Sequence, residues 1–326
     1  MSNKDVEIWV LVDHRIGNAN QAIDLAEMLD MDFEIKKIEY NFFSKLPNSF
    51  LSLFPFHVKW SILSQIKKHQ CNKIIISAGR RTAALAVYLK KNSGTEYSTK
   101  IIQIMRPDID PQQFDLIILP QHDSFNHILP NLVRIIGALT NTKNKIQKNQ
   151  DEFDKYYRLE NKYIAVIIGG STKKYKLTLD EVKIFAETLS NISKNHELQL
   201  FITFSRRTPS NVKAYLQNKF AQSHIIYDPA NGGSNPYPVI LSKAEYIILT
   251  ADSITMCSES ASTGKPLYIY CSPNFKLKKH NFFIQQLVDL GIARRFDVEE
   301  NNLKHYNYTP LAESAKVAAI IKTKIF

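Results

Sequence analysis

Short apolar runs rich in Val, Ile and Leu recur along this chain, and stretches with helical periodicity, such as 18–29 and 80–91, separate several of them. Short β-rich runs that alternate with helices are typical of a parallel, doubly wound sheet. The sequence therefore predicts an α/β fold. The expected strands are 7–13, 33–40, 73–79, 100–105, 115–120, 162–170, 198–205, 224–228, 245–252 and 266–272.

The length and the restart of this pattern indicate two domains. A chain of 326 residues exceeds what one hydrophobic core usually serves. A polar segment rich in Lys and Asn, 140–162, separates the two series of strands and is expected to connect the domains. We expect two Rossmann-like domains that face each other across a cleft, over 1–150 and 151–310. A final helix within 311–326 is expected to pack back on the first domain.

The composition of the chain indicates the cellular compartment in which the protein is expected. The chain has no apolar run of about 18 residues, and its first residues lack the apolar core of a signal peptide, so a cytoplasmic protein is expected. Cys71, Cys257 and Cys271 lie far apart, inside or beside apolar runs. This spacing favours reduced, buried thiols over disulfides or zinc ligands.

The formal net charge of +11 suits nucleic acid, an anionic membrane or a phosphorylated small molecule. Nucleic acid is not expected, because no aromatic-basic interleaving or known binding module accompanies the charge. Lysines are scattered, and the group at 143–148 fits a solvated face, whereas arginines form adjacent pairs at 80–81, 206–207 and 294–295. The planar guanidinium suits phosphate and carboxylate oxygens.

Polar turns follow several strands of the second half, where ligands bind in open α/β sheets. The turn Gly169-Gly170-Ser171-Thr172 would let backbone amides approach a phosphate, although a plain tight turn explains it equally well. Arg206 and Arg207 follow the next strand and would face an anion. Asn235 is a candidate for capping the following helix and for donor binding, although a purely structural turn explains it equally well.

The stretch 250–266 is the strongest candidate for a phosphate site. A helix that begins near Ser253 would direct its free amides and the positive end of its dipole beyond the sheet. The hydroxyls of Thr250, Ser253 and Thr255 would add donors, and Asp252 lies in the same turn. Glu259, about one and a half turns into the helix, would accept hydrogen bonds from a ribose. The alternative is an ordinary exposed helix residue.

Polar residues after the strands of the first half are candidates for a second part of the site. A reaction that deprotonates a substrate hydroxyl needs a base, and His or Asp can provide it. The pair at 122–123 is equally compatible with a structural role in closing a loop. The catalytic candidates are Asp13, His122 and Asp123, and the candidates for binding an acidic acceptor or the leaving phosphate are Arg15, Arg80 and Arg81.

The stretch ESASTGKPL, 259–267, after an apolar strand is similar to the donor-binding signature of GT-B glycosyltransferases, especially the N-acetylglucosaminyltransferase of peptidoglycan synthesis. In that family the matching glutamate holds the ribose of UDP, and a GGS turn opens the same domain. The resemblance implies that role for Glu259.

Motifs along nearly the whole chain resemble the elongated-mitochondria fission-protein family and its bacterial relatives. The first turn departs from that family, which usually has Asp-Gly-Arg-Pro-Gly-His where this chain has DHRIGN, 13–18, so a role of the last histidine does not transfer to Asn18. The matching motifs are SAGRRT (77–82), FDLIILPQHD (114–123), VIIGGSTKKYKL (166–177), SRRTP (205–209), NPY (235–237), TADSITMCSESASTGKP (250–266) and HNFFIQQLVDLGIARRF (280–296).

Two functions follow from these observations. The first is a metal-independent GT-B-type glycosyltransferase that uses a nucleotide-diphosphate sugar, needs no cofactor, and acts on a lipid-linked or cell-envelope acceptor. The segment 41–63, rich in Phe and Leu, would then dock on the inner face of an anionic membrane, although core packing explains it equally well. The second, taken from the fission-protein resemblance, is a non-catalytic membrane-peripheral adapter that retains the fold.

Overall fold

The computed structural model describes residues 6–66, 71–94, 96–125, 128–157, 162–232 and 235–326. The chain forms two compact units, Met1–Asn141 with Ala312–Phe326, and Thr142–Leu311. Each unit contains one six-stranded sheet in which all the paired strands are parallel. The predicted α/β class with parallel sheets is thereby confirmed.

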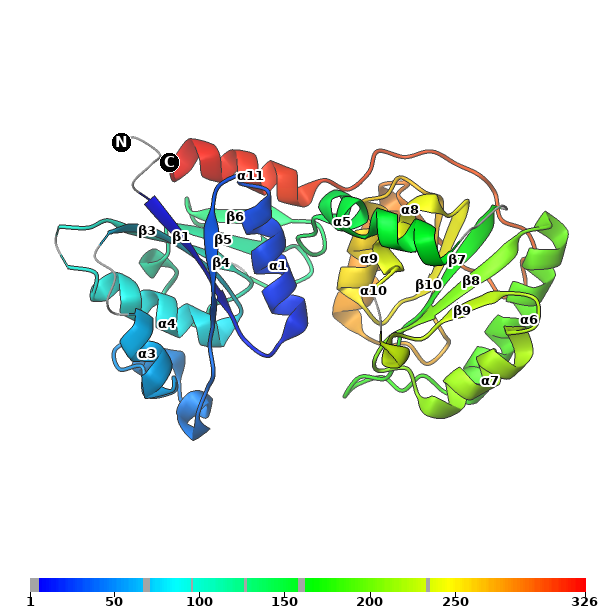
Figure 1. Cartoon of the computed structure of the whole chain (residues 1–326), viewed down its shortest axis with the longest axis horizontal. Coiled ribbons are helices and arrows are strands. Elements are labelled where there is room, and N and C mark those ends of the chain that lie inside the picture. Colours follow the sequence, from blue (N-terminus) through cyan, green and yellow to red (C-terminus); the bar gives the residue numbers. More distant parts are fainter. Residues whose placement is uncertain (1–5, 67–70, 95, 126–127, 158–161, 233–234) are drawn as a thin grey trace. The chain divides into compact units, whose positions relative to one another are not determined.

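The first unit has the strand order β2-β1-β3-β4-β5-β6. Successive side chains of β1 enter different cores: Val10 packs with α1 and α11, and Trp9 packs with α4. Figure 1 shows α1 and α11 on one face of this sheet and α4 on the other. Its elements are β1 (Val6–Val12), α1 (Ile16–Glu27), β2 (Phe33–Lys37), α2 (Asn48–Leu51), α3 (Trp60–Ile66), β3 (Asn72–Ala78), α4 (Arg80–Lys91), β4 (Thr99–Ile104), β5 (Leu116–Pro120), β6 (Leu132–Ile135) and α11 (Glu313–Lys324).

The second unit has the strand order β12-β11-β10-β7-β8-β9, the arrangement of dinucleotide-binding folds. Every residue of β7 and β10 is buried, as expected for central parallel strands covered on both faces. Its elements are α5 (Thr142–Tyr156), β7 (Tyr163–Ile168), α6 (Leu179–His196), β8 (Gln199–Phe204), α7 (Ser210–Phe220), β9 (Ile225–Tyr227), α8 (Tyr237–Lys243), β10 (Tyr246–Thr250), α9 (Ile254–Ala261), β11 (Leu267–Tyr270), α10 (Lys278–Asp289) and β12 (Ala293–Arg295).

The junction between the units differs from the expected boundary at 150. The second unit begins at Thr142, and the segment expected to connect the domains contains α5. Phe153 of that helix is 1% exposed and contacts Phe201 of β8, with ring centroids 6.2 Å apart. One buried aromatic side chain therefore attaches an otherwise polar helix to the second core.

Candidate functional site

The switch point of the second sheet lies between β7 and β10. In open α/β sheets, ligands bind at the carboxyl ends of the strands beside such a switch point. The turn at 169–172 follows β7, and Thr250 and Asp252 lie at the end of β10. The sequence therefore predicted two groups of polar residues that the topology brings together.

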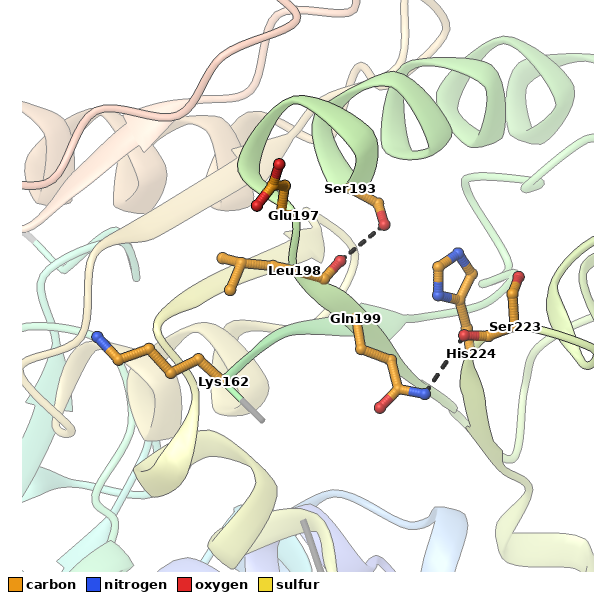
Figure 2. A pocket seen from close by; sticks show the side chains of 7 residues that line it. All are labelled: Lys162, Ser193, Glu197, Leu198, Gln199, Ser223 and His224. Atoms are coloured by element: carbon orange, nitrogen blue, oxygen red, sulfur yellow. Dashed lines mark hydrogen bonds between the residues drawn. The ribbon is translucent and has the colours of Figure 1, made fainter. Parts of the chain in front are cut away.

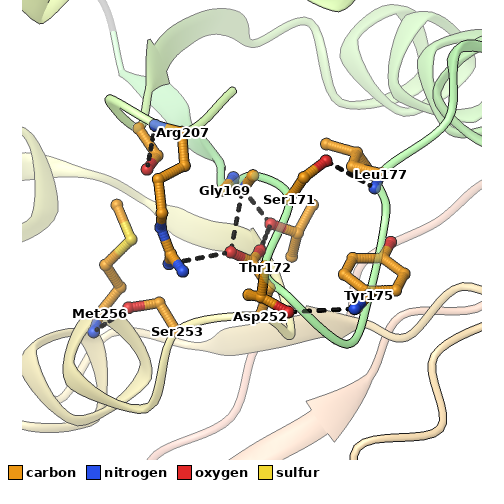
Figure 3. Close-up of polar contacts among 12 residues, drawn as sticks. Gly169, Ser171, Thr172, Tyr175, Leu177, Arg207, Asp252, Ser253 and Met256 are labelled. Atoms are coloured by element: carbon orange, nitrogen blue, oxygen red, sulfur yellow. Dashed lines mark hydrogen bonds and ion pairs between the residues drawn. The ribbon is translucent and has the colours of Figure 1, made fainter. Parts of the chain in front are cut away.

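The four amides of the turn at 169–172 already have partners within the unit (Figure 3). Gly169 N donates to Thr250 Oγ1 over 2.8 Å, and Gly170 N donates to an Asp252 carboxylate oxygen over 2.8 Å. Ser171 N and Thr172 N donate to the carbonyls of Arg207 and Tyr175. Of the two interpretations of this turn, a phosphate cradle and a plain tight turn, the arrangement fits the tight turn, because its amides join the strand ends to each other.

Close packing explains why both glycines are needed. A Cβ on Gly169 would lie 1.8 Å from Asp252 Oδ1, and a Cβ on Gly170 would lie 2.2 Å from the backbone of Arg207. Neither approach is compatible with a larger side chain at the observed backbone positions. The two glycines therefore allow the segments that follow β7, β8 and β10 to pack closely against each other.

Asp252 is the centre of this polar cluster and is only 2% exposed. Its carboxylate accepts hydrogen bonds from Gly170 N and from Thr250 Oγ1, the latter over 2.7 Å, and lies 3.3 Å from Arg207 Nη2. Burial raises the pKa of Asp252, while the Gly170 amide, Thr250 and Arg207 oppose that rise. Asp252 therefore organises the switch point and holds Arg207 there, with almost half of the Arg207 side chain exposed.

The amino terminus of α9 lies directly beside this cluster. Ser253 caps the helix by accepting a hydrogen bond from Met256 N, and residues 253–256 are partly exposed while 257–261 are buried. The first turn, 254–257, carries no acidic residue. Its positive dipole end is thus the accessible part of the helix.

Glu259 is buried in the second unit and is not the exposed residue of the alternative interpretation. It is 9% exposed, and its carboxylate accepts a hydrogen bond from Lys145 Nζ over 3.1 Å. Burial, followed by the charge of Glu259, raises the pKa of Tyr237. Lys145 belongs to the lysine-rich group that the sequence placed on a solvated face. No local pattern marks it, since the two partners lie 114 residues apart.

Four other side chains belong to this edge of the second sheet. Arg206 is exposed, whereas Thr255 is partly exposed in the first turn of α9. Asn235 accepts a hydrogen bond from Tyr237 N, the first residue of α8, but it is not the N-cap of that helix, because Pro236 occupies the N-cap position. His280, which opens the matching motif at 280–296 but was not predicted as a site residue, lies beside Asp252, and burial lowers its pKa against the opposing effects of the Asp252 charge and backbone.

In the first unit the switch point lies between β1 and β3. Asp13 follows β1, and one of its oxygens accepts a hydrogen bond from Arg15 N over 2.9 Å. Arg81, at the start of α4, places its guanidinium 5.5 Å from the Tyr40 ring centroid. Burial and then the charge of Asp13 raise the pKa of Tyr40, so Tyr40 is a neighbour that the sequence did not reveal.

The catalytic candidates of the first unit do not form one cluster. His122 and Asp123 follow β5, and β3 and β4 lie between β5 and β1 in the sheet. Three strand spacings separate the ends of β1 and β5 by roughly 14 Å. The Asp123 carbonyl accepts a hydrogen bond from Arg134 Nη2, and Arg80 Nη2 reaches the Leu46 carbonyl. Asn18 contacts the switch point through Nδ2, which donates to the Ala78 carbonyl.

A pocket of about 600 Å³ lies at the opposite edge of the second sheet (Figure 2). None of the predicted site residues lines it. Lys162, Glu197, Gln199 and His224 come from the amino ends of strands, away from the edge where this fold binds ligands. Ser193 Oγ and Gln199 Nε2 donate to backbone carbonyls of Leu198 and Ser223. We assign no function to this pocket.

Comparison with solved structures finds the same fold over nearly the whole chain. The UDP-GlcNAc 2-epimerase of Methanocaldococcus jannaschii is 12% identical with a TM-score of 0.58, and the match covers 98% of this chain and 99% of that one. The UDP-GlcNAc 2-epimerase of Neisseria meningitidis is 12% identical with a TM-score of 0.51, over 98% and 99% of the two chains. These likenesses support the predicted GT-B-like architecture.

Sequence comparison establishes the family. An uncharacterised protein of Rickettsia prowazekii (strain Madrid E) is 42% identical over 97% of this chain and 98% of its own length. The mitochondrial fission protein ELM1 of Arabidopsis thaliana is 25% identical over 77% of this chain, and the match spans 64% of that relative. The model of the family described as mitochondrial fission ELM1 matches residues 16–325, so the chain belongs to this family, as its motifs predicted.

Proposed function

We propose that this protein is a glycosyltransferase that binds a nucleotide-diphosphate sugar at the carboxyl edge of its second sheet. The observation that carries the proposal is the placement of buried Glu259 six residues after the Ser253 cap on α9. Six residues of helix span about 9 Å. A diphosphate at the amino terminus of α9 would therefore place its ribose beside the carboxylate.

The charges of the site suit the leaving group. Amides at the start of α9 and the Arg207 guanidinium supply positive charge where the diphosphate would become more negative during transfer. Lys145 pairs with Glu259 and offsets the cost of burying its charge, which keeps an acceptor for ribose hydroxyls. These residues supply the stabilisation from the protein itself, so we propose transfer without a metal.

UDP-sugars are the first donors to test. The Neisseria meningitidis epimerase structure is described as bound to UDP-GlcNAc, and a second Methanocaldococcus jannaschii epimerase structure, with a TM-score of 0.52, contains UDP-GlcNAc and UDP. The shared fold supports the choice of nucleotide and leaves the sugar to experiment.

For the acceptor side we propose Asp13 as the base. It stands at the switch point of the first sheet with Arg15 and Arg81 nearby, while Asp123 and His122 are three strands away. Arginines at this edge would hold an anionic acceptor, in keeping with the lipid-linked or cell-envelope acceptor expected from the sequence. Asp13 is partly exposed and so is reachable by a hydroxyl group.

Thermal unfolding with a panel of UDP, UDP-GlcNAc, ADP and GDP tests donor binding. A ligand at 100 times its Kd stabilises the folded state by about 2.7 kcal/mol. We expect UDP to raise the melting temperature of the native protein, and Glu259→Gln to weaken UDP binding by about ten-fold or more, since an amide binds ribose hydroxyls less strongly than a carboxylate.

The matched control is Glu187→Gln on α6, an exposed glutamate that pairs with Lys219 in the same unit. It should retain UDP binding. The melting temperature without nucleotide shows first whether Glu259→Gln folds normally. Absence of stabilisation by every nucleotide in the panel would contradict the proposal and favour the adapter function, for which Glu259→Gln should change nothing.

A further inference from the structure

One segment of the first unit exposes an unusual concentration of large apolar side chains. Among the described residues, eight of the sixteen exposed large apolar side chains lie between 42 and 60. Phe42 is 80% exposed and Trp60 is 75% exposed. We call the eight residues the aromatic platform; they are Phe42, Phe43, Leu46, Phe50, Leu53, Phe54, Phe56 and Trp60.

The platform is a built surface that the rest of the unit holds in place. Tyr40 forms an antiparallel bridge with Val58, and Asn41 N donates to the His57 carbonyl over 2.9 Å. Asn48 Nδ2 donates to the carbonyls of Arg80 and Pro107, each over 2.7 Å. The first two contacts join the ends of the segment to each other, and the bonds of Asn48 fix its middle to the start of α4 and to the loop after β4.

The core of the first unit does not use the platform side chains. Leu51, Val58 and Leu63 come from the same stretch of chain and are at most 4% exposed. These three residues supply its inward packing. Phe54 and Phe56 instead stack on each other outside the core, with ring centroids 5.7 Å apart, and Phe50 lies within 6.4 Å of both. Exposed large apolar side chains concentrated in one short segment are typical of an interaction site.

Charge around the platform identifies the kind of partner. Residues 40–66 contain no Asp or Glu, and Lys45 Nζ lies 5.7 Å from the Phe42 ring centroid. Arg80 reaches the platform through the Leu46 carbonyl, and Lys59 borders it while pairing with Glu39. Two copies of this surface would bring like charges together, whereas an anionic membrane would accept both the rings and the cations.

We propose that the aromatic platform docks this protein on the interface of an anionic lipid bilayer. Phe and Trp rings would enter the headgroup region while lysine and arginine remain at the level of lipid phosphates. No helix among the described residues is both long and apolar enough to cross a bilayer. The inference goes beyond nucleotide binding and holds for a transferase or an adapter.

Tryptophan fluorescence gives a direct test, because Trp60 is 75% exposed and the other tryptophan, Trp9, is 1% exposed. Phosphatidylcholine vesicles containing phosphatidylglycerol should shift the emission to the blue, and pure phosphatidylcholine vesicles should do so less. Brominated acyl chains should quench the bound signal. Trp60→Phe should retain vesicle binding and lose the spectral shift.

Sedimentation with the same vesicles tests the surface itself. The triple variant Phe42→Ser, Phe54→Ser, Trp60→Ser should bind anionic vesicles at least about ten-fold more weakly, because it lacks three exposed rings that would enter the bilayer interface. The control triple variant Ile184→Ser, Phe282→Ser, Leu290→Ser removes three exposed apolar side chains from the second unit and should bind normally. Lys45→Glu should weaken binding to anionic vesicles and leave binding to pure phosphatidylcholine vesicles unchanged.

Three outcomes would overturn the inference: no binding of the native protein to anionic vesicles, equal binding by the two triple variants, or concentration-dependent dimers that the platform variant abolishes without any vesicle binding. The last would assign the surface to a second copy of the chain. Circular dichroism and UDP-dependent stabilisation of the platform variant separate a folding defect, or a failure of nucleotide binding, from a failure of docking.

Discussion

At the scale of single residues, Asp252 shows how one buried acid can organise the ends of several strands. Its carboxylate joins the ends of β7 and β10 and lies beside Arg207. A bare carboxylate at a phosphate site would repel the ligand. Here its acceptor capacity is used by the protein, and Arg207 retains an exposed face.

Two replacements of Asp252 distinguish what its hydrogen bonds and volume contribute to stability from what its charge contributes. Asp252→Ala leaves the Gly170 amide and Arg207 without their partner and should cost about 1–3 kcal/mol of unfolding free energy. Asp252→Asn keeps an acceptor and the volume and should cost less. Urea denaturation of the three proteins at neutral pH measures the difference, and equal losses in both variants would show that the charge itself is essential.

The difference in stability between the native protein and Asp252→Asn should change with pH in one direction. Burial raises the pKa of Asp252 above its ordinary value of 3.8, so the folded state favours the protonated acid. Asp252 therefore contributes fully to the free energy of unfolding below pH 3.8, and this contribution is lost as the pH rises through the pKa of Asp252 in the folded state. The stability of the native protein relative to Asp252→Asn should therefore fall as pH rises from below 3.8 to neutrality. An increase would contradict this assignment.

At the scale of elements, the central strands were predictable because buried parallel strands are continuous apolar runs, as in YIAVII of β7. The edge strands β6 and β12 were missed, since LVRI and ARR are short and carry arginine. The segment 41–63 contains both core and exposed apolar residues. No regular period separates the two kinds, so only the folded structure distinguishes Leu51 from Phe50.

The polar site was predictable in part for a related reason. The residues after β7, β8 and β10 were identified because parallel topology brings strand ends together. The hydrogen-bond partners of these residues were not predictable, because the partners lie far apart in the sequence. Lys145 and Glu259 are 114 residues apart, and Gly170 and Asp252 are 82 residues apart. Whether an amide faces a ligand or another side chain depends on such long-range pairs.

His57 provides a pH test of the element that carries the platform. It is fully buried and stacks on Tyr40, with centroids 5.6 Å apart, and burial lowers its pKa from 6.5 to about 4. The buried neutral His57 contributes stability that is complete above pH 6.5 and is lost as the pH falls toward the folded-state pKa of about 4. His57→Phe keeps an aromatic ring and should reduce the loss of stability over this range.

Urea midpoints of the native protein and His57→Phe across the same pH range check this expectation. The control is His305→Phe, which changes an exposed histidine in the second unit and should leave the acid dependence unchanged. If His57→Phe loses stability on acidification as steeply as the native protein, another group is responsible.

At the scale of the whole molecule, the two ends of the chain meet in one unit. Val317 and Ile321 of α11 are fully buried in the core that also contains Val10 and Ile76. Ser314 Oγ accepts a hydrogen bond from Thr140 N, and Glu313 accepts one from Ile136 N. The first unit is therefore completed by residues that follow the whole second unit in the sequence.

This arrangement predicts selective destabilisation of one unit. Ile321→Ala should lower the stability of the first unit by about 2–5 kcal/mol, because it leaves a cavity beneath α11. Hydrogen exchange should increase in peptides from β1, β3 and β4, while peptides from β7, β8 and β10 keep their protection and, with UDP bound, gain more. Lys324→Ala, an exposed change on the same helix, should alter neither set. Equal loss of protection in both sets would mean that the units unfold as one cooperative body, since a defect confined to the first core would otherwise leave the second sheet intact.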